Sequence, residues 1–318
     1  MPRSKKLKIA VSGSLAYDQI MDFPGRFSDH ILPKEIHNLN LSFFLSGLRR
    51  SYGGTAGNIA YNLTLLKEKP IILGIAGFDF GDYRAWLKKQ GADISRVRTV
   101  ASDRTATAYI ITDQADNQIA AFYPGATPKD YASRARALKD IDLAIIAADD
   151  KGRMLDYVAA YQSNHIPYIF DPGQALIAFA SVELLKSIKG AKVLIGNDYE
   201  IKLIADKLKL KLADLVGMVE ILIITKGGQG SEIYSGESKI TVKPAKPKNT
   251  SDPTGAGDAY RAGLIKGLLM GYNLKACAQL ASTVSVYTVE KYGTQTHKFS
   301  LMELKKRYYQ NYRGKLSI

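Results

Sequence analysis

Six short, almost continuously apolar runs recur along the chain, and longer stretches of mixed apolar and polar residues separate them. Runs without polar alternation are typical of strands that are buried on both faces, as in a parallel sheet. Strands that alternate with helices predict an α/β fold of three layers, in which helices cover both faces of a mostly parallel central sheet. The predicted strands span residues 8–14, 70–77, 142–148, 167–171, 192–197 and 220–227.

Helical spacing occurs in several of the intervening stretches. Apolar residues share one face of residues 55–66, and a second helical pattern follows Ala259. A third predicted helix, residues 82–91, ends on Gly91, which suits the left-handed conformation found at many helix C-termini.

Two segments, residues 15–50 and 103–125, interrupt this alternation. The first has no clean helical pattern, and the second contains two predicted strands joined by a polar turn at residues 114–117. We therefore predict a single domain over residues 1–318, with both segments inserted as a small β-rich lid. A lid over the edge of the sheet would close a site between the two parts.

The charge of the chain raises the question of a nucleic-acid partner. The sequence has 44 Lys and Arg against 30 Asp and Glu, which gives a net charge of +14. Nucleic-acid binding usually gathers basic residues on one surface, whereas here they are scattered along the sequence. We therefore favour an enzyme with a lysine-rich surface that handles small anions, and we expect no nucleic-acid partner.

Cysteine usage and hydropathy predict a cytoplasmic protein. The single cysteine, Cys277, excludes an internal disulfide and lies in a pattern typical of a buried helix position. No apolar run approaches the roughly 20 residues that span a bilayer, and the N-terminal residues lack the apolar core of a signal peptide. We expect no membrane partner.

The stretch SDPTGAGDAYRAG, residues 251–263, places three small residues before an aspartate at a predicted helix start. Gly255, Ala256 and Gly257 leave backbone N–H groups uncovered, and such groups at a helix N-terminus form an anion site. Asp258 then has two interpretations. Either it caps the helix, or it is a general base that takes a hydroxyl proton while the amides hold a phosphoryl group.

A second glycine-rich turn, GGTAGN, also precedes a predicted helix. Gly53 and Gly54 would allow a polar ligand to approach the backbone closely, with Asn58 bonding a hydroxyl. Alternatively, the turn only leads into the helix and Asn58 is a local cap. Two such turns in one chain favour a cleft for two substrates.

Two further stretches follow predicted strands. Asn197 and Glu200, in NDYE, have the spacing of a capping box, or they form a polar pair that faces magnesium and phosphates through water. Residues 225–230, TKGGQG, are a hairpin turn or a nucleotide-binding loop at the carboxyl end of a strand, where open α/β sheets bind ligands.

Together these four stretches resemble the PfkB, or ribokinase-like, family of carbohydrate and nucleoside kinases. GGTAGNIAYNL resembles its N-terminal signature, DPTGAGDAYRAG its C-terminal signature with proline in the second position, NDYE its NxxE motif, and TKGGQG its nucleotide loop. Within the family, the chain is most similar to bacterial adenosine kinases, chiefly through VSGSLAYDQIMDFPGRFSDHILP and LSFFLSGLRRSYGGTAGN.

The resemblance implies ATP, Mg²⁺ and transfer of the γ-phosphoryl group to a ribose 5′-hydroxyl, which gives AMP when adenosine is the acceptor. It makes Asp258 the catalytic base and the amides of Gly255, Ala256 and Gly257 the anion hole. The other roles it implies are sugar contacts from Asp18, Gly53, Gly54 and Asn58, base contacts from Ser14, Phe122 and Gln174, nucleotide contacts from Asn197, Thr225, Lys226, Gly228 and Gly230, magnesium contact through water from Glu200, and a monovalent cation (K⁺) at Asp252 and Gly293.

The acceptor stays open. Bacterial adenosine kinases carry further polar residues in the stretch that corresponds to DPGQALIAF, where this chain keeps Gln174 but has no arginine before Phe179. Polar contacts to the base decide much of the choice between nucleosides, so a kinase for ribose or a related free sugar is the alternative. A non-catalytic nucleotide-binding protein is a further alternative, which Asp258 beside its glycine-rich turn disfavours.

The inserted β segments of some family members pair between subunits, so the resemblance also implies a homodimer through the lid. The apolar residues 39–46, LNLSFFLS, would then be part of the interface. Alternatively, they form the underside of the lid.

Overall fold

The computed structural model describes residues 7–31, 41–115, 117–126 and 141–318. Within these ranges, an eight-stranded sheet has the order β14-β13-β12-β11-β10-β9-β1-β4. Strands β13 (Ser231–Ser235) and β14 (Ser238–Val242) form an antiparallel edge. The remaining strands are parallel: β1 (Ile9–Ser12), β4 (Ile71–Leu73), β9 (Leu143–Ile146), β10 (Tyr168–Phe170), β11 (Val193–Asn197) and β12 (Ile221–Thr225).

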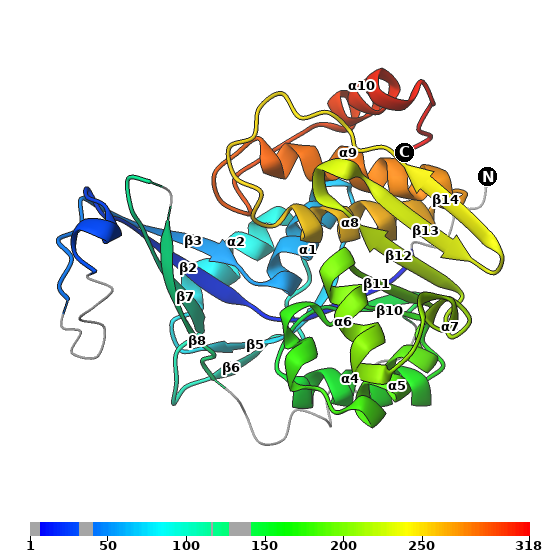
Figure 1. Ribbon diagram of the computed structural model, residues 1–318, viewed down its shortest axis with the longest axis horizontal. Helices are drawn as coiled ribbons and strands as arrows, with labels where there is room; N and C mark the ends of the chain where they lie inside the picture. The colour runs from blue at the N-terminus through cyan, green and yellow to red at the C-terminus, as the bar shows by residue number, and fades with distance from the viewer. Residues whose placement is uncertain (1–6, 32–40, 116, 127–140) are drawn as a thin grey trace.

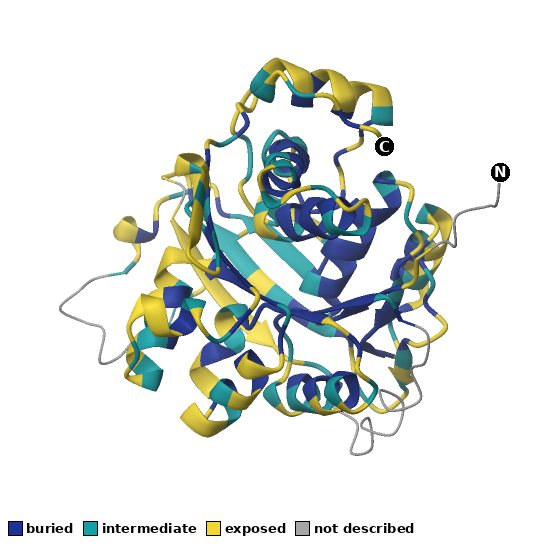
Figure 2. Ribbon diagram, turned by 90° about the vertical axis from the view of Figure 1, so that its right-hand side faces the viewer, coloured by how far each residue is buried: buried dark blue, intermediate teal, exposed yellow. Residues whose placement is uncertain are grey.

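Helices cover both faces of this sheet (Figures 1 and 2). Alternate residues of each strand face opposite cores, as Ile145 and Ile146 of β9 show. The predicted three-layer α/β fold is therefore confirmed. One layer contains α1 (Thr55–Leu65), α2 (Gly81–Gln90), α8 (Ala256–Leu269) and α9 (Leu274–Val289), with α10 (Leu301–Tyr312) packed on α9; the other contains α4 (Lys151–Ser163), α5 (Ser181–Lys189), α6 (Asp198–Leu208) and α7 (Leu212–Val216).

The single strand predicted over residues 70–77 is wrong. β4 ends at Leu73, and Gly74 separates it from β5 (Ile75–Gly77). β5 pairs with β6 (Arg98–Val100) in a separate two-stranded sheet. Both strands are largely buried. Their residues are therefore apolar on both sides of Gly74, and the sequence pattern does not reveal the break between them.

A second, four-stranded sheet in the order β3-β2-β7-β8 projects from one side of the body (Figure 1). Its strands are β2 (Ala16–Asp22), β3 (Gly47–Gly53), β7 (Ala106–Thr112) and β8 (Gln118–Tyr123). The polar turn predicted between the last two strands is present, because Asp113 Oδ1 accepts the N–H groups of Ala115 and Asn117. β3 leads directly into α1, which places this sheet beside the helix layer.

The apolar stretch before β3 is described from residue 41, so residues 39 and 40 lie outside the described ranges. The ring centroid of Phe43 lies 4.7 Å from that of Phe23 and 5.3 Å from that of Phe27, which begins the short helix η1 (Phe27–Asp29). Phe44, in contrast, is 90% exposed. One aromatic residue thus packs against Phe23 and Phe27 while its neighbour is exposed, and a homodimer through this sheet stays a prediction.

Two sequence signals that predicted helix ends are confirmed in the structure. Gly91 follows α2 in the left-handed conformation, with φ at 98°. The capping box is also present, because Asn197 Oδ1 accepts the Glu200 N–H at 2.8 Å and Glu200 Oε2 accepts the Asn197 N–H at 2.7 Å.

Cys277 is buried in α9. None of the helices in the described ranges is both long and apolar enough to cross a membrane.

His297, which follows α9, is buried in a setting that disfavours its charged form. Asn62 Nδ2 donates to the Asn58 carbonyl at 2.9 Å, so Asn62 Oδ1 accepts from His297 Nε2 at 2.8 Å. Among the described residues, His297 Nδ1 has no hydrogen-bond partner. Burial lowers the pKa of His297 to about 4.

We expect the folded protein to lose stability as this histidine becomes protonated. The unfolded chain binds the proton near pH 6.5 and the folded chain only near its lower pKa, so stability is full above about pH 6.5 and falls by up to ~1.4 kcal/mol per pH unit toward pH 4. Chemical denaturation of the wild type and of His297→Gln over this range measures the effect. The difference between the two curves isolates His297 from carboxyl groups with raised pKa values, whose contributions have the opposite sign. Parallel curves would contradict the prediction.

Candidate active site

The carboxyl ends of the parallel strands bring several polar residues to one edge of the central sheet. Ligands of open α/β sheets bind at this edge. The first turns of α1 and α8 reach the same region. The polar residues are Ser14 after β1, Asp149 after β9, Asp171 after β10, Asn197 at the end of β11 and Thr225 at the end of β12.

Asp258 lies in the first turn of α8 and does not cap it. The N-cap is Gly255, whose φ of 76° suits glycine, and a Cβ there would lie 2.9 Å from Thr294 Cγ2. Asp258 Oδ2 instead accepts a hydrogen bond from Asn58 Nδ2 of α1 at 2.8 Å. The capping interpretation of Asp258 is therefore wrong, because its carboxylate is turned toward another helix.

The setting of Asp258 gives it a proton affinity suited to acid–base chemistry. Burial raises the pKa of Asp258 to about 7, although the Asn58 hydrogen bond and the charge of Arg261 lower it. Burial, together with the charge of Asp252, raises the pKa of Asp18 to about 6. Carboxyl groups that titrate near neutrality and lie close together are typical of catalytic sites. At neutral pH, Asp258 can take a proton from a hydroxyl group.

One of the three amides predicted to form the anion hole at the start of α8 donates within the chain. The Ala256 N–H donates to the Pro253 carbonyl at 3.1 Å and closes a turn. The N–H groups of Gly255 and Gly257 have no hydrogen-bond partner within the described ranges. Two of the three predicted amides are therefore free to meet an anion.

The predicted sugar-contacting residues come together beside Asp258. A Cβ on Gly53 would lie 2.6 Å from Asp18 Oδ2, so a larger residue there would displace that carboxylate. Gly54 is the N-cap of α1. Asn58 is not a local cap, because its side chain contacts Asp258 and Gln295, which are more than 190 positions away.

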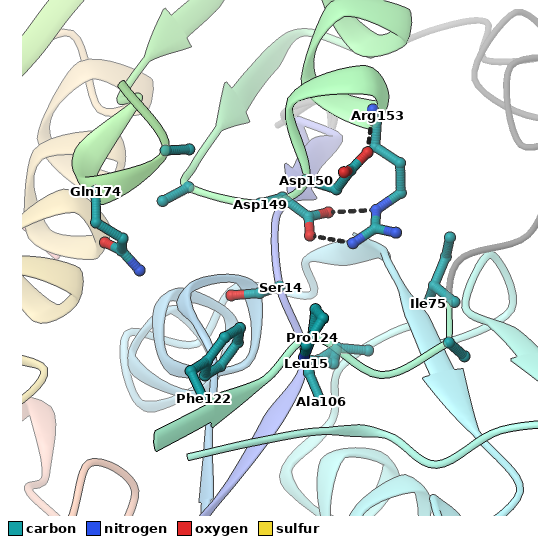
Figure 3. Close-up of a pocket in the computed structure, with 13 residues that line it drawn as sticks. Ser14, Leu15, Ile75, Ala106, Phe122, Pro124, Asp149, Asp150, Arg153 and Gln174 are labelled. Carbon is teal, nitrogen blue, oxygen red and sulfur yellow. Dashed lines mark hydrogen bonds and ion pairs between the residues drawn. The ribbon is translucent and has the colours of Figure 1, made fainter. Parts of the chain in front are cut away.

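A pocket of about 200 Å³ lies where the four-stranded sheet meets the central sheet (Figure 3). The three predicted base contacts, Ser14, Phe122 and Gln174, all line it, with Gln174 on the short helix η3 (Gly173–Ala178). A largely apolar slot with a few polar groups suits a flat heterocycle. The remaining lining residues are Leu15, Ile75, Ala106, Pro124, Ala126, Ala148, Asp149, Asp150, Arg153 and Ala175, and Arg153 is held by Asp149.

The TKGGQG stretch connects β12 to β13 through the short helix η4 (Gly227–Gln229), so the hairpin interpretation is confirmed. The Lys226 N–H donates to the Gly230 carbonyl at 2.8 Å. Lys226 Nζ lies 2.8 Å from Glu232 Oε1, so its charge is already paired. Gly228 borders open space. The nucleotide contacts of Thr225, Lys226, Gly228 and Gly230 stay predictions.

The described side chains of the site could contact a metal ion, but they do not form a complete set of metal ligands. Within the described ranges, no group of three or more His, Cys, Asp or Glu residues is arranged to hold one. Glu200 uses one carboxylate oxygen in the capping box, which suits a magnesium ion bound through water and phosphates. Both oxygens of Asp252 accept backbone N–H groups, from Gly293 at 3.0 Å and from Thr254 at 2.9 Å.

Three residues near the site were not predicted from the sequence. Arg261, one turn after Asp258, donates two hydrogen bonds of 2.8 Å to Asp171 in a buried ion pair. Asp171 directly follows a strand of the central sheet, which was a readable signal. Gln295 contacts Asn58 from the chain after α9 and has no signal in the sequence around it.

Comparisons with known proteins show which family and which solved structures the chain resembles. Residues 15–299 match the family model described as pfkB family carbohydrate kinase. A nucleoside kinase from Methanothermobacter thermautotrophicus is 34% identical over 274 residues, which cover 85% of this chain and 88% of that protein. The structure of a Burkholderia thailandensis nucleoside kinase in complex with inosine gives a TM-score of 0.86 at 35% identity and covers 96% of this chain and 99% of its own. The Methanocaldococcus jannaschii nucleoside kinase gives 0.85 at 29% identity, with coverage of 96% and 99%.

The buried ion pair below Asp258 gives a stability prediction. We expect Arg261→Met to lower the free energy of unfolding by about 3–5 kcal/mol, because it leaves the Asp171 carboxylate buried without its partner. The double variant Arg261→Met with Asp171→Leu should recover most of this loss, since both charges are gone. Urea denaturation measures both values, and a single variant as stable as the wild type would contradict the prediction.

Proposed function

The chain belongs to the pfkB family of carbohydrate kinases, and we propose that it is an ATP-dependent nucleoside kinase that phosphorylates the ribose 5′-hydroxyl. The observation that carries this proposal is the hydrogen bond between Asn58 and Asp258. Through it, the helix beside the sugar-contacting residues and the helix beside the anion site meet at one carboxylate. Two relatives that are 34% and 33% identical, and whose matches cover 88% and 85% of their own lengths, are nucleoside kinases, which supports a nucleoside as the acceptor.

Adenosine is the acceptor we propose first, with AMP as the product. A purine can stack on Phe122 in the pocket, and the Gln174 amide can both donate to and accept from the edge of the base. These properties fit a 6-oxopurine as well. Inosine is therefore the second candidate, because it is the ligand named for the Burkholderia thailandensis structure.

The proposed mechanism assigns each step to residues of this chain. Asp18 accepts hydrogen bonds from ribose hydroxyls. Asp258 accepts the 5′-hydroxyl proton as that oxygen attacks the γ-phosphorus. The N–H groups of Gly255 and Gly257 donate to the oxygens of the transferring phosphoryl group. Closure of the four-stranded sheet excludes water, which would otherwise accept the phosphoryl group.

We further propose that ATP lies along residues 225–230 and beside Asn197. Lys226 reaches its phosphates only if it leaves Glu232. Magnesium, when bound, neutralises phosphate charge, and Glu200 would contact it through water. A K⁺ site at Asp252 and Gly293 also stays a proposal; a cation there would have to share the carboxylate with two backbone N–H groups.

A kinase for a free sugar is the rival function. Asp18, Gly53 and Asn58 would hold a free sugar as they hold a ribosyl group. The pocket favours a nucleoside, because a free sugar would leave Phe122 and Gln174 without a ligand to contact.

Asp258→Asn tests the catalytic base. We expect kcat to fall by about 10²–10⁴-fold, because the amide cannot accept the hydroxyl proton, while ATP binding measured by calorimetry is retained. In the wild type, kcat should rise with pH through about 7, since only the deprotonated form of Asp258 is active. Turnover near the wild-type level in Asp258→Asn would remove Asp258 from this role.

A substrate panel of adenosine, inosine, cytidine, ribose and fructose tests the acceptor class. We expect phosphorylation of nucleosides and none of the free sugars. Phe122→Ala should raise the KM for nucleosides, because it removes the stacking surface. Ile119→Ala, on the other face of β8, is the matched control and should keep the wild-type KM. Activity on free sugars alone would overturn the nucleoside assignment.

A further inference from the structure

A continuous line of hydrogen bonds runs from Trp86 on α2 to Asp258 on α8 through two amide side chains. Trp86 Nε1 donates to Gln295 Oε1 at 3.0 Å. Gln295 Nε2 donates to Asn58 Oδ1 at 3.1 Å, and Asn58 Nδ2 donates to Asp258 Oδ2 at 2.8 Å. Gln295 and Asn58 are only 4% and 5% exposed, so water has little access to compete for these bonds.

The indole N–H of Trp86 determines which group donates and which accepts in every hydrogen bond of this line. An indole N–H only donates, so Gln295 must present its oxygen to Trp86 and its nitrogen to Asn58. Asn58 must then present its oxygen to Gln295 and its nitrogen to Asp258. Tyr83 fixes the same orientation independently, because its hydroxyl donates to the Gly53 carbonyl at 2.8 Å and therefore accepts from Gln295 Nε2 at 2.6 Å.

The segment that carries Gln295 is anchored on both sides of the site. The Gly293 N–H donates to Asp252 at 3.0 Å, and Thr294 Oγ1 donates to the Tyr52 carbonyl at 2.7 Å. These bonds connect it to the loop before α8 and to β3. Gln295 therefore has a fixed position relative to both groups of proposed substrate contacts.

We propose that Gln295 is a positioning residue for the catalytic base, which acts by holding Asn58 in the orientation that donates to Asp258 Oδ2. Asp258 Oδ1 is then left for the acceptor hydroxyl. The inference rests on the proposed kinase function. With Asn58 turned over, its amide oxygen would face the carboxylate, and repulsion would favour the protonated acid, which cannot take a proton.

The other groups around Asp258 do not provide this control. Asp171 after β10 and Asp18 on β2 raise its pKa, and Arg261 on α8 lowers it, each with a fixed sign of charge. Tyr83 on α2 stays neutral, because burial raises the pKa of its hydroxyl. Asn58 is the neighbour whose effect reverses when its side chain turns over.

Two substitutions of Gln295 test the inference together. Gln295→Glu accepts from Trp86 but cannot donate to Asn58, and Gln295→Met removes the amide without adding charge. We expect both to lower kcat roughly tenfold to a hundredfold, the effect of losing one hydrogen bond to a charged group. Both should move the kcat–pH profile to higher pH while the KM for ATP is kept.

Gln279→Glu on α9 is the matched control. Gln279 Oε1 accepts from Tyr308 Oη at 2.8 Å, which a glutamate also does, so kcat and its pH profile should stay at the wild-type values. Wild-type profiles in both Gln295 variants would overturn the inference. A shift in Gln295→Glu alone would overturn it too, because added charge then explains the effect.

A spectroscopic test needs no turnover. Trp86 is the only tryptophan, so its indole N–H gives one resonance in protein labelled with ¹⁵N-tryptophan. We expect this resonance to titrate with a midpoint near pH 7, the pKa of Asp258, and to stop titrating in Asp258→Asn. An indole chemical shift that does not change as Asp258 ionises would overturn the inference. Failure of the wild type to phosphorylate any nucleoside would instead contradict the proposed function, and the two results are separate.

Discussion

The hydrogen bond between Asn58 and Asp258 is the contact on which the arrangement of the site depends. It joins residues 200 positions apart and brings together the first turns of α1 and α8. Each of these helices begins after a glycine with positive φ, 83° at Gly54 and 76° at Gly255. Each turn therefore directs the chain sharply into its helix. The residues proposed to hold the sugar and those proposed to hold the phosphoryl group share one carboxylate as a result.

The same carboxylate is kept near the point of ionisation by opposing effects. Burial favours the protonated form of Asp258, and the amide of Asn58 with the charge of Arg261 favours the ionised form. Arg261 is itself held by Asp171, so its charge is partly compensated within the protein. A lone buried carboxylate would stay protonated at neutral pH, and one fully paired with an arginine would be too weak a base. The intermediate balance suits proton transfer.

The sequence predicted the parts of the fold that depend on local pattern. Buried strands appear in the sequence as continuous apolar runs. A glycine such as Gly91 indicates where a helix ends. The break at Gly74 was missed because the residues on both sides of it are apolar. Asp258 and Asn58 were each compatible with a helix cap, since a cap and a distant contact use the same residue types. Gln295 was missed because a tertiary hydrogen bond leaves no periodic trace in the sequence.

Aromatic residues gather beside the line of hydrogen bonds that ends at Asp258. Tyr52 of β3 stacks on Tyr83 with ring centroids 4.6 Å apart and 12° between the planes, and it stacks on Trp86 at 5.9 Å. Tyr83 and Trp86 are the two residues that fix the orientation of Gln295. The Gln295 amide has one orientation that accepts from the indole N–H of Trp86 and donates to the hydroxyl of Tyr83. The aromatic layer that supports the four-stranded sheet beside the pocket therefore also sets the direction of the hydrogen bonds that reach the proposed base.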